Sequence, residues 1–147
     1  MKKVLFISID NSTRSQIAEA WMNHLYGNRF KAYSAGLSPA KAISPLAVKV
    51  MKEKGIDISH KRPRSAFDVY KSGDSFSYII TVCDKSSAER CPVFLGLIKQ
   101  VHWDFSNPSS FSGAEEEIVD KLRLIRDSIH DQIISWCDEI SEEDELL

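Results

Sequence analysis

Apolar residues along this chain follow two different periods. Short runs rich in β-branched and aromatic residues have the length and composition of β-strands, and they lie at residues 4–9, 30–35, 78–82 and 100–103. The run at 78–82 is continuously apolar, which is typical of a strand buried on both faces of a parallel sheet. Between the runs, apolar residues recur at every third or fourth position, which is the period of one helix face.

Three segments show this helical period. The first is expected from residue 14 until Gly27 ends it, and its buried face carries Ile17, Trp21 and Leu25. The second begins at Ser44-Pro45, an N-cap followed by the residue favoured at the first helical position, and extends to Gly55. The third begins at a glutamate triplet, which suits the positive end of a helix dipole. Its apolar stripe consists of Ile118, Leu122, Ile125, Ile129, Ile133 and Trp136.

The remaining segments are more polar. Residues 57–73 predict a loop with a short helix at 66–70, and residues 141–147 predict an acidic, frayed tail. Strands that alternate with amphipathic helices indicate right-handed βαβ units and a parallel sheet covered on both faces. We therefore expect a single α/β domain over residues 1–140.

Composition narrows the possible functions. A net charge of −2 offers no basic field for nucleic acid, so no nucleic-acid partner is expected. No apolar run approaches the ~20 residues of a membrane span, and the run after Lys3 is too short for a signal peptide. The histidines lack metal-ligand spacing. Cys83, Cys91 and Cys137 are an odd number, which favours a cytoplasmic chain whose close cysteine pair is catalytic or redox-active.

The first strand passes into the first helix through a tight turn that predicts an anion site. Unpaired backbone N–H groups and the positive end of the helix dipole converge at such a turn. Arg14 adds a planar, always-charged group suited to a tetrahedral oxyanion. Ser8 ends the strand with five residues between it and Arg14, so the frame S-x5-R is that of a phosphatase loop without the thiol.

Two further segments are expected beside this turn. Ligands of parallel α/β folds bind outside the carboxyl ends of the strands. Ser8, Cys83 and the segment after Trp103 all follow predicted strand ends. The sequence thus places three chemically suggestive segments on one rim of the sheet.

Short motifs occur in a defined order along nearly the whole chain. They are NS-x-RSQ-x-AE at 11–19, SAG at 34–36, Pro45 with Ala47-Val48, GIDIS at 55–59, VCD at 82–84, CP at 91–92, HW at 102–103, Pro108, Gly113 with its glutamate triplet, and RD at 126–127. In order and spacing they resemble the low-molecular-weight protein tyrosine phosphatase superfamily and, within it, the thiol-dependent arsenate reductases. The resemblance implies a doubly wound four-stranded parallel sheet with flavodoxin-like layers, and reduction of arsenate.

The resemblance also implies site residues and partners. It places the nucleophile at Ser8, the oxyanion clamp at Arg14, a disulfide relay at Cys83 and Cys91, and the general acid at Asn107. The oxyanion-binding loop would comprise Ser8, Ile9, Asp10, Asn11, Ser12, Thr13, Arg14 and Ser15. We expect arsenate, phosphate or sulfate as ligand, no bound cofactor, an external thiol donor such as thioredoxin or a low-molecular-weight thiol, and a monomer.

Three residues depart from the chemistry that the resemblance implies. Ser8 cannot ionise like a thiol at a helix N-terminus, and it cannot form the adduct or the disulfide that reduction requires. Asn107 has no proton to give a leaving group, and Asp104 is a weak substitute. Asp10 brings a carboxylate into a loop that should grip an anion, and its orientation stays open. We expect the chain as written to be impaired in arsenate reduction.

Three hypotheses follow. In the first, an arsenate reductase or phosphatase has had its cysteine replaced by serine, a change that keeps a substrate bound. In the second, the protein is a natural, catalytically silent relative that binds an oxyanion or a protein partner. In the third, it is a weak hydrolase on another phosphate-containing substrate, as in a low-molecular-weight phosphatase. Several neighbours have bland alternatives: Ser12 could be the helix N-cap, His102 and Trp103 are expected to pack under the rim, and Cys137 to lie in the core.

Overall fold

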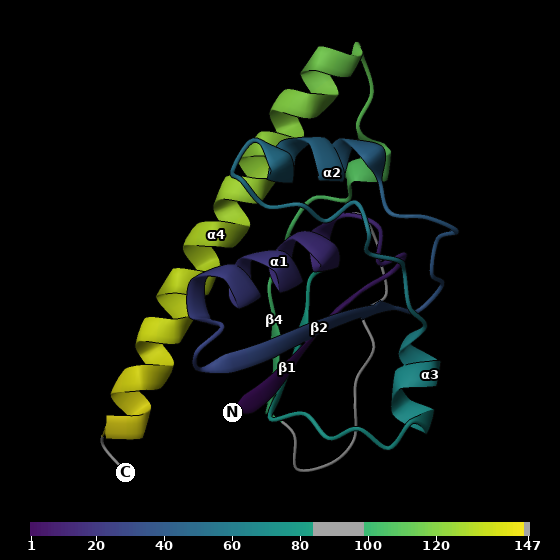
Figure 1. Cartoon of the computed structure of the whole chain (residues 1–147). Coiled ribbons are helices and arrows are strands. Elements are labelled where there is room, and N and C mark those ends of the chain that lie inside the picture. The colour runs from purple at the N-terminus through teal and green to yellow at the C-terminus, as the bar shows by residue number, and fades with distance from the viewer. Residues whose placement is uncertain (84–98, 146–147) are drawn as a thin grey trace.

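The computed structural model describes residues 1–83 and 99–145, with side chains up to residue 140 (Figure 1). Its centre is a parallel sheet of four strands in the order β2-β1-β3-β4. The strands are β1 (Lys2–Ser8), β2 (Phe30–Gly36), β3 (Tyr78–Thr81) and β4 (Lys99–His102). Each overlaps a strand predicted from sequence, and the predicted fold class is confirmed.

Helices cover both faces of the sheet (Figure 1). They are α1 (Arg14–Tyr26), α2 (Pro45–Lys52), α3 (Ala66–Lys71) and α4 (Glu115–Glu145), with a short 3-10 helix, η2 (Pro108–Ser110), before α4. The larger core lies between the sheet and α1, α2 and α4, whereas α3 covers a smaller core on the opposite face. None of the helices in the described part combines the length and hydropathy of a membrane span.

The position of β1 in the middle of the sheet explains why its sequence is apolar at successive positions. Val4 and Phe6 face the core beneath α1 and α4, while Leu5 and Ile7 face the core beneath α3. Because side chains alternate along a strand, a strand covered on both faces needs apolar residues at every position. The same argument applies to β3, where Ile79 and Ile80 face opposite cores.

Two helix ends differ from the sequence prediction. Helix α2 ends at Lys52, and the chain then turns so that Gly55 has a φ of +76°. Helix α4 continues to Glu145, into the segment expected to be a frayed tail. Ile140 is buried and extends the apolar stripe by one turn beyond Trp136, and no glycine or proline follows it to stop the helix.

Candidate oxyanion site

The loop between β1 and α1 is held from outside by the segment that follows β2. Backbone carbonyl oxygens of Ser8, Ile9 and Asp10 accept hydrogen bonds from the N–H groups of Leu37, Ser38 and Ala40 at 3.2, 2.8 and 2.9 Å, and Ser12 O accepts one from Ser44 N at 3.0 Å. In a trans peptide the C=O and the N–H point in opposite directions. The N–H groups of residues 9, 10, 11 and 13 therefore point away from residues 37–44, and that of Asn11 donates to Ser8 Oγ.

Gly36 allows this close approach. It pairs with Ser8 at the ends of β2 and β1. A Cβ atom at Gly36 would lie 2.8 Å from the carbonyl oxygen of Ile9 and 2.9 Å from the backbone nitrogen of Asn11. Only glycine fits against the loop here, because both neighbouring atoms belong to the backbone.

Asn11 is the centre of the hydrogen bonds inside the loop. It has a φ of +54°, a left-handed conformation that asparagine tolerates better than most residues. Its side chain donates to Ser15 Oγ at 2.7 Å and accepts from the backbone N–H of Arg64 at 2.9 Å and from Gln16 Nε2 at 3.2 Å. Asn11 thus ties the loop to the start of α1 and to Arg64.

Ser8 is fully buried at the base of the loop. Its Oγ accepts a hydrogen bond from the backbone N–H of Asn11 at 3.0 Å and lies 2.7 Å from Ser15 Oγ. Neither partner is a base, so nothing in these contacts would remove the proton of the hydroxyl. Two donors around a thiolate would stabilise its charge and lower its pKa. The surroundings of position 8 therefore suit a cysteine nucleophile better than a serine one.

Arg14 opens α1 and is only 2% exposed. Its Nη1 donates to the carbonyl oxygen of Phe105 at 3.1 Å, which joins the loop to the segment after β4. The buried guanidinium and the N-terminus of α1 together give this end of the sheet a positive potential.

Asp10 turns its carboxylate back onto the loop. Its Oδ1 accepts a hydrogen bond from the backbone N–H of Ser12 at 3.1 Å. One alternative from the sequence, that Ser12 is the N-cap of α1, is wrong. The N-cap is Thr13, whose side chain makes no capping hydrogen bond. The hydroxyl that contacts Ser8 is that of Ser15, one helical turn further on.

Asn107 stands beside this loop. Its Oδ1 accepts from the backbone N–H of Ser109 at 3.0 Å and from Ser109 Oγ at 2.9 Å, so the side chain caps η2. A pocket of about 210 Å³ lies between Asn107 and the loop. It is lined by Asp10, Ser12, Thr13, Ser44, Leu46, Asn107, Pro108, Ser109, Ile118 and Leu122. The structure thus brings the predicted general-acid position and the loop to one pocket.

The cysteines are placed unequally. Cys83 is buried just after β3, at the same end of the sheet as Ser8, whereas Cys91 lies outside the described residues, so the relay stays a prediction. Cys137 lies in the core with its Sγ 3.9 Å from Met22 Sδ, and burial raises the pKa of its thiol to about 11. A thiol that stays protonated at neutral pH is a poor nucleophile, in keeping with the structural role expected for Cys137.

The remaining rim residues pack. Trp103 is buried, with its ring centroid 5.8 Å from that of Phe6 and 6.0 Å from that of Trp136. His102 Nδ1 lies 2.7 Å from Thr81 Oγ1 on the neighbouring strand. Among the described residues no group of three or more histidine, cysteine or acidic side chains could hold a metal ion.

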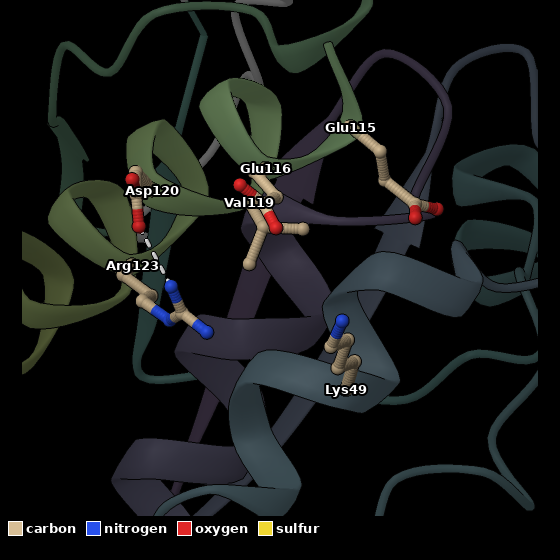
Figure 2. Close-up of a pocket in the computed structure, with 6 residues that line it drawn as sticks. All are labelled: Lys49, Glu115, Glu116, Val119, Asp120 and Arg123. Atoms are coloured by element: carbon tan, nitrogen blue, oxygen red, sulfur yellow. Dashed lines mark hydrogen bonds and ion pairs between the residues drawn. The ribbon is translucent and has the colours of Figure 1, made fainter.

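A more highly charged pocket lies elsewhere, between α2 and the start of α4 (Figure 2). Its volume is about 240 Å³, and it is lined by Lys49, Glu115, Glu116, Val119, Asp120 and Arg123. Figure 2 shows Lys49 across the pocket from the glutamates, and Arg123 paired with Asp120 at 2.7 Å. Arg123 also pairs with Glu53 at 2.7 Å, so its charge is already matched within the protein.

Comparisons with known proteins agree with this geometry. A family model described as low molecular weight phosphotyrosine protein phosphatase matches residues 3–146. The arsenate reductase of Bacillus subtilis (strain 168) is 36% identical over 138 residues, which are 93% of this chain and 96% of that protein. An arsenate reductase in the phosphate binding state superposes with a TM-score of 0.75 at 26% identity, over 95% of this chain and 99% of that one. A thioredoxin-dependent arsenate reductase of Corynebacterium glutamicum superposes with a TM-score of 0.60 at 28% identity, over 90% of this chain and 62% of that one.

The chain belongs to the low molecular weight phosphotyrosine protein phosphatase family. Within that family it is arsenate reductase-like, as the order of its motifs predicted. Sequence reasoning found the loop residues but missed Gln16, Arg64 and Phe105 as their partners. The sequence indicates Ser15, Gln16 and Gly36 only as parts of the motifs that the family resemblance rests on. Nothing in the sequence indicated that Arg64 bonds to Asn11.

Proposed function

We propose that the protein binds arsenate or phosphate in the loop of residues 8–15 and that, with serine at position 8, it does not reduce arsenate. The observation that carries this proposal is the outward bonding of the loop carbonyls at residues 8, 9, 10 and 12. It turns the N–H groups of residues 9, 10, 11 and 13 away from residues 37–44, and Arg14 and the α1 N-terminus add positive charge at this end of the sheet. A relative solved in the phosphate binding state supports phosphate as the ligand.

The missing reaction follows from the chemistry of the side chain at position 8. In a reductase of this kind, a thiolate attacks arsenic, water leaves, and a second thiol attacks the sulfur so that arsenite departs as a disulfide forms. A serine oxygen can displace water from arsenate, but it cannot take part in a disulfide and so cannot deliver two electrons. We assign the second and third thiols of such a relay to Cys83 and Cys91.

A partner and a location follow from the relay. A disulfide formed on the protein must be reduced by an external dithiol. The C. glutamicum relative is described as thioredoxin-dependent, so we propose a thioredoxin-like reductant. Since free thiols persist in a reducing compartment, we place the protein in the cytoplasm, and we propose a monomer.

The test is turnover of Ser8→Cys with arsenate and a dithiol reductant, beside the chain as given. We expect arsenite from Ser8→Cys alone, and phosphate binding by both proteins in calorimetry. A Cys83→Ser change in the Ser8→Cys background should then stop turnover but leave phosphate binding unchanged. If neither protein binds phosphate, the loop is not an oxyanion site. If Ser8→Cys binds phosphate yet produces no arsenite, Asn107 or Asp10 prevents the reaction and the protein is a silent binder.

A further inference from the structure

A pocket at the edge of the sheet is more basic than the molecule as a whole. It is lined by residues of α1, β2 and the segment 60–64, and its volume of about 450 Å³ exceeds that of the pocket beside the loop. Lys31, Lys61, Arg62 and Arg64 line it, and Glu19 is the one acid in its described lining. With histidine neutral the lining carries a formal charge of +3, whereas the whole chain carries −2.

The acid in this pocket does not balance the cations. Glu19 is 6% exposed, and its carboxylate lies 3.7 Å from Lys61 Nζ. Burial raises the pKa of Glu19, although Lys61 and Arg64 oppose the rise. In the described part of the chain no carboxylate lies within ion-pair distance of Lys31, Arg62 or Arg64. Because like charges around one cavity repel each other, an anion in the pocket would replace repulsion by attraction.

The backbone that carries the two arginines is held in place. The carbonyl oxygen of Arg62 accepts a hydrogen bond from Gln16 Nε2 at 3.2 Å. Arg64 donates its N–H to Asn11 Oδ1 at 2.9 Å, and its carbonyl oxygen accepts from the N–H of Gly36 at 2.8 Å. Both side chains therefore extend from fixed positions, which reduces the entropy lost when they bind a ligand.

The wall that β2 forms indicates what kind of ligand fits. β2 is at the edge of the sheet, where the strand of a partner could be added. Asn23 blocks this, because its side chain donates to the carbonyl oxygen of Ala32 at 3.1 Å and accepts from the Ala32 N–H at 2.9 Å. The N–H of Gly36 is bonded to Arg64 O. These edge groups are already occupied, so the pocket favours a compact ligand over an extended peptide.

We propose that this pocket binds compact polyanions that contain a diphosphate group, of which inorganic pyrophosphate is the smallest. A diphosphate carries several negative charges at neutral pH and offers oxygen atoms to more than one guanidinium. Arg62 and Arg64 supply these planar groups, and Lys31 adds a third positive charge. The cavity has the volume of roughly fifteen water molecules, which is ample for two phosphate groups. The inference does not rest on the proposed function, since no residue of the loop 8–15 belongs to the described lining.

The experiment titrates pyrophosphate into the full chain and into two double variants by calorimetry. Arg62→Gln with Arg64→Gln should lower the affinity about tenfold, because two exposed charge pairs with the ligand are lost. Lys52→Gln with Lys71→Gln is the matched control. It removes the same charge from exposed positions at the ends of α2 and α3, and it should lower the affinity less than about twofold.

A third variant and a second ligand locate the site and define the ligand. Arg14→Lys, which weakens phosphate binding by the loop, should keep the affinity for pyrophosphate within about twofold. Pyrophosphate should also shift the amide NMR signals of Ser34 and Arg64 in the unmodified chain. ADP contains the same diphosphate group. Binding of both ligands supports a site for the group itself, and binding of pyrophosphate alone supports a free anion as the ligand.

The possible results separate the two proposals. An unchanged affinity in the arginine variant, or an equal loss in the lysine variant, would overturn the pocket as a diphosphate site. A loss in Arg14→Lys as large as that in the arginine variant would overturn it too, since pyrophosphate would then be bound by the loop. If inorganic phosphate binds none of the proteins while pyrophosphate binding depends on Arg62 and Arg64, the oxyanion loop is wrong and the pocket stands. Thermal unfolding of each variant shows whether a loss of binding reflects loss of the fold.

Discussion

Two polar networks in this molecule differ in charge. The network inside the loop consists of hydroxyl and amide groups of Ser8, Asn11 and Ser15, buried and formally neutral. The network between α2 and α4 consists of ions: Glu53 pairs with Arg123 at 2.7 Å and with Arg126 at 2.8 Å. One network fixes the shape of a backbone, and the other joins two helices.

The difference teaches where a ligand can gain energy. In the ionic network each charge already has a partner, so a charged ligand would have to displace one. In the loop, neutral side chains position the backbone N–H groups. Asp10 is the one acidic residue among residues 8–15, so most of the positive potential of these N–H groups is available to a ligand. The pocket between α2 and α4 is also lined by three acidic and two basic side chains, so it is the weaker candidate for binding an anion.

The largest change in stability is expected from replacing Asn11, which tests whether the neutral network supports the loop. Asn11→Ala should lower the free energy of unfolding by about 3 kcal/mol, because buried partners on Ser15, Gln16 and Arg64 lose their hydrogen bonds and alanine disfavours a positive φ. Urea unfolding measures this loss. Asn11→Gly also loses the hydrogen bonds, but glycine tolerates the positive φ. Its free energy of unfolding should therefore be only about 1 kcal/mol higher than that of Asn11→Ala. A loss below about 0.5 kcal/mol in Asn11→Ala would mean that the neutral network does not support the loop.

A smaller effect should distinguish the two networks directly. Arg14→Lys should weaken phosphate binding about tenfold, since lysine cannot reproduce the two-pronged contact of a guanidinium with an oxyanion. Arg123→Lys makes the same exchange in the ionic network and should leave phosphate binding unchanged. Calorimetric titration of both variants decides the matter. Equal losses in the two variants would point to general electrostatics rather than to a site.

The smallest expected effect concerns pH and the ionic network alone. Hydrogen bonds from Arg123 and Arg126 lower the pKa of Glu53 from 4.5 to about 2. A carboxylate with a depressed pKa stabilises the folded state fully above its unfolded pKa and loses that contribution as the pH falls from about 4.5 to 2. The thermal midpoint should therefore fall less steeply over this range in Glu53→Gln than in the unmodified chain.

Glu116→Gln provides the matched control for that titration. Glu116 lies exposed in the same pocket as Arg123, and Glu116→Gln removes one acid without touching the ion pairs of Glu53, so it should change the slope of stability against pH less than Glu53→Gln does. If Glu53→Gln and Glu116→Gln show the same slope, the ion pairs of Glu53 do not contribute to stability in solution.

The sequence was sufficient for the sheet and most of the helices because their signals are local. The apolar stripe of α4 and the Ser44-Pro45 start of α2 depend on residues a few positions apart, and the structure has both elements. The end of α2 was misplaced at Gly55, since a helix end depends on which turn the chain makes next. The end of α4 was misplaced because Ile140 gains its burial from other elements rather than from its neighbours.

The site was predictable only as a loop with an arginine. Its position between a strand and a helix is local, but the contacts that shape it join distant residues: Asn11 with Arg64, and Arg14 with Phe105. No spacing rule indicates such pairs. Asn107 illustrates another limit, because its role as a cap of η2 is visible only once the turn at Pro108 is known.

The outward hydrogen bonds of the loop have a consequence for how such a protein can change over time. The loop carbonyls are held by residues 37–44, and the side chain at position 8 takes no part in those bonds, although its Oγ accepts the Asn11 N–H inside the loop. The conformational entropy of the loop is thus lost when the chain folds, so ligand binding does not have to order the loop. Oxyanion binding depends on the loop N–H groups, whereas reactivity depends on the side chain at position 8. A protein can therefore lose the reaction through one substitution and keep the binding loop.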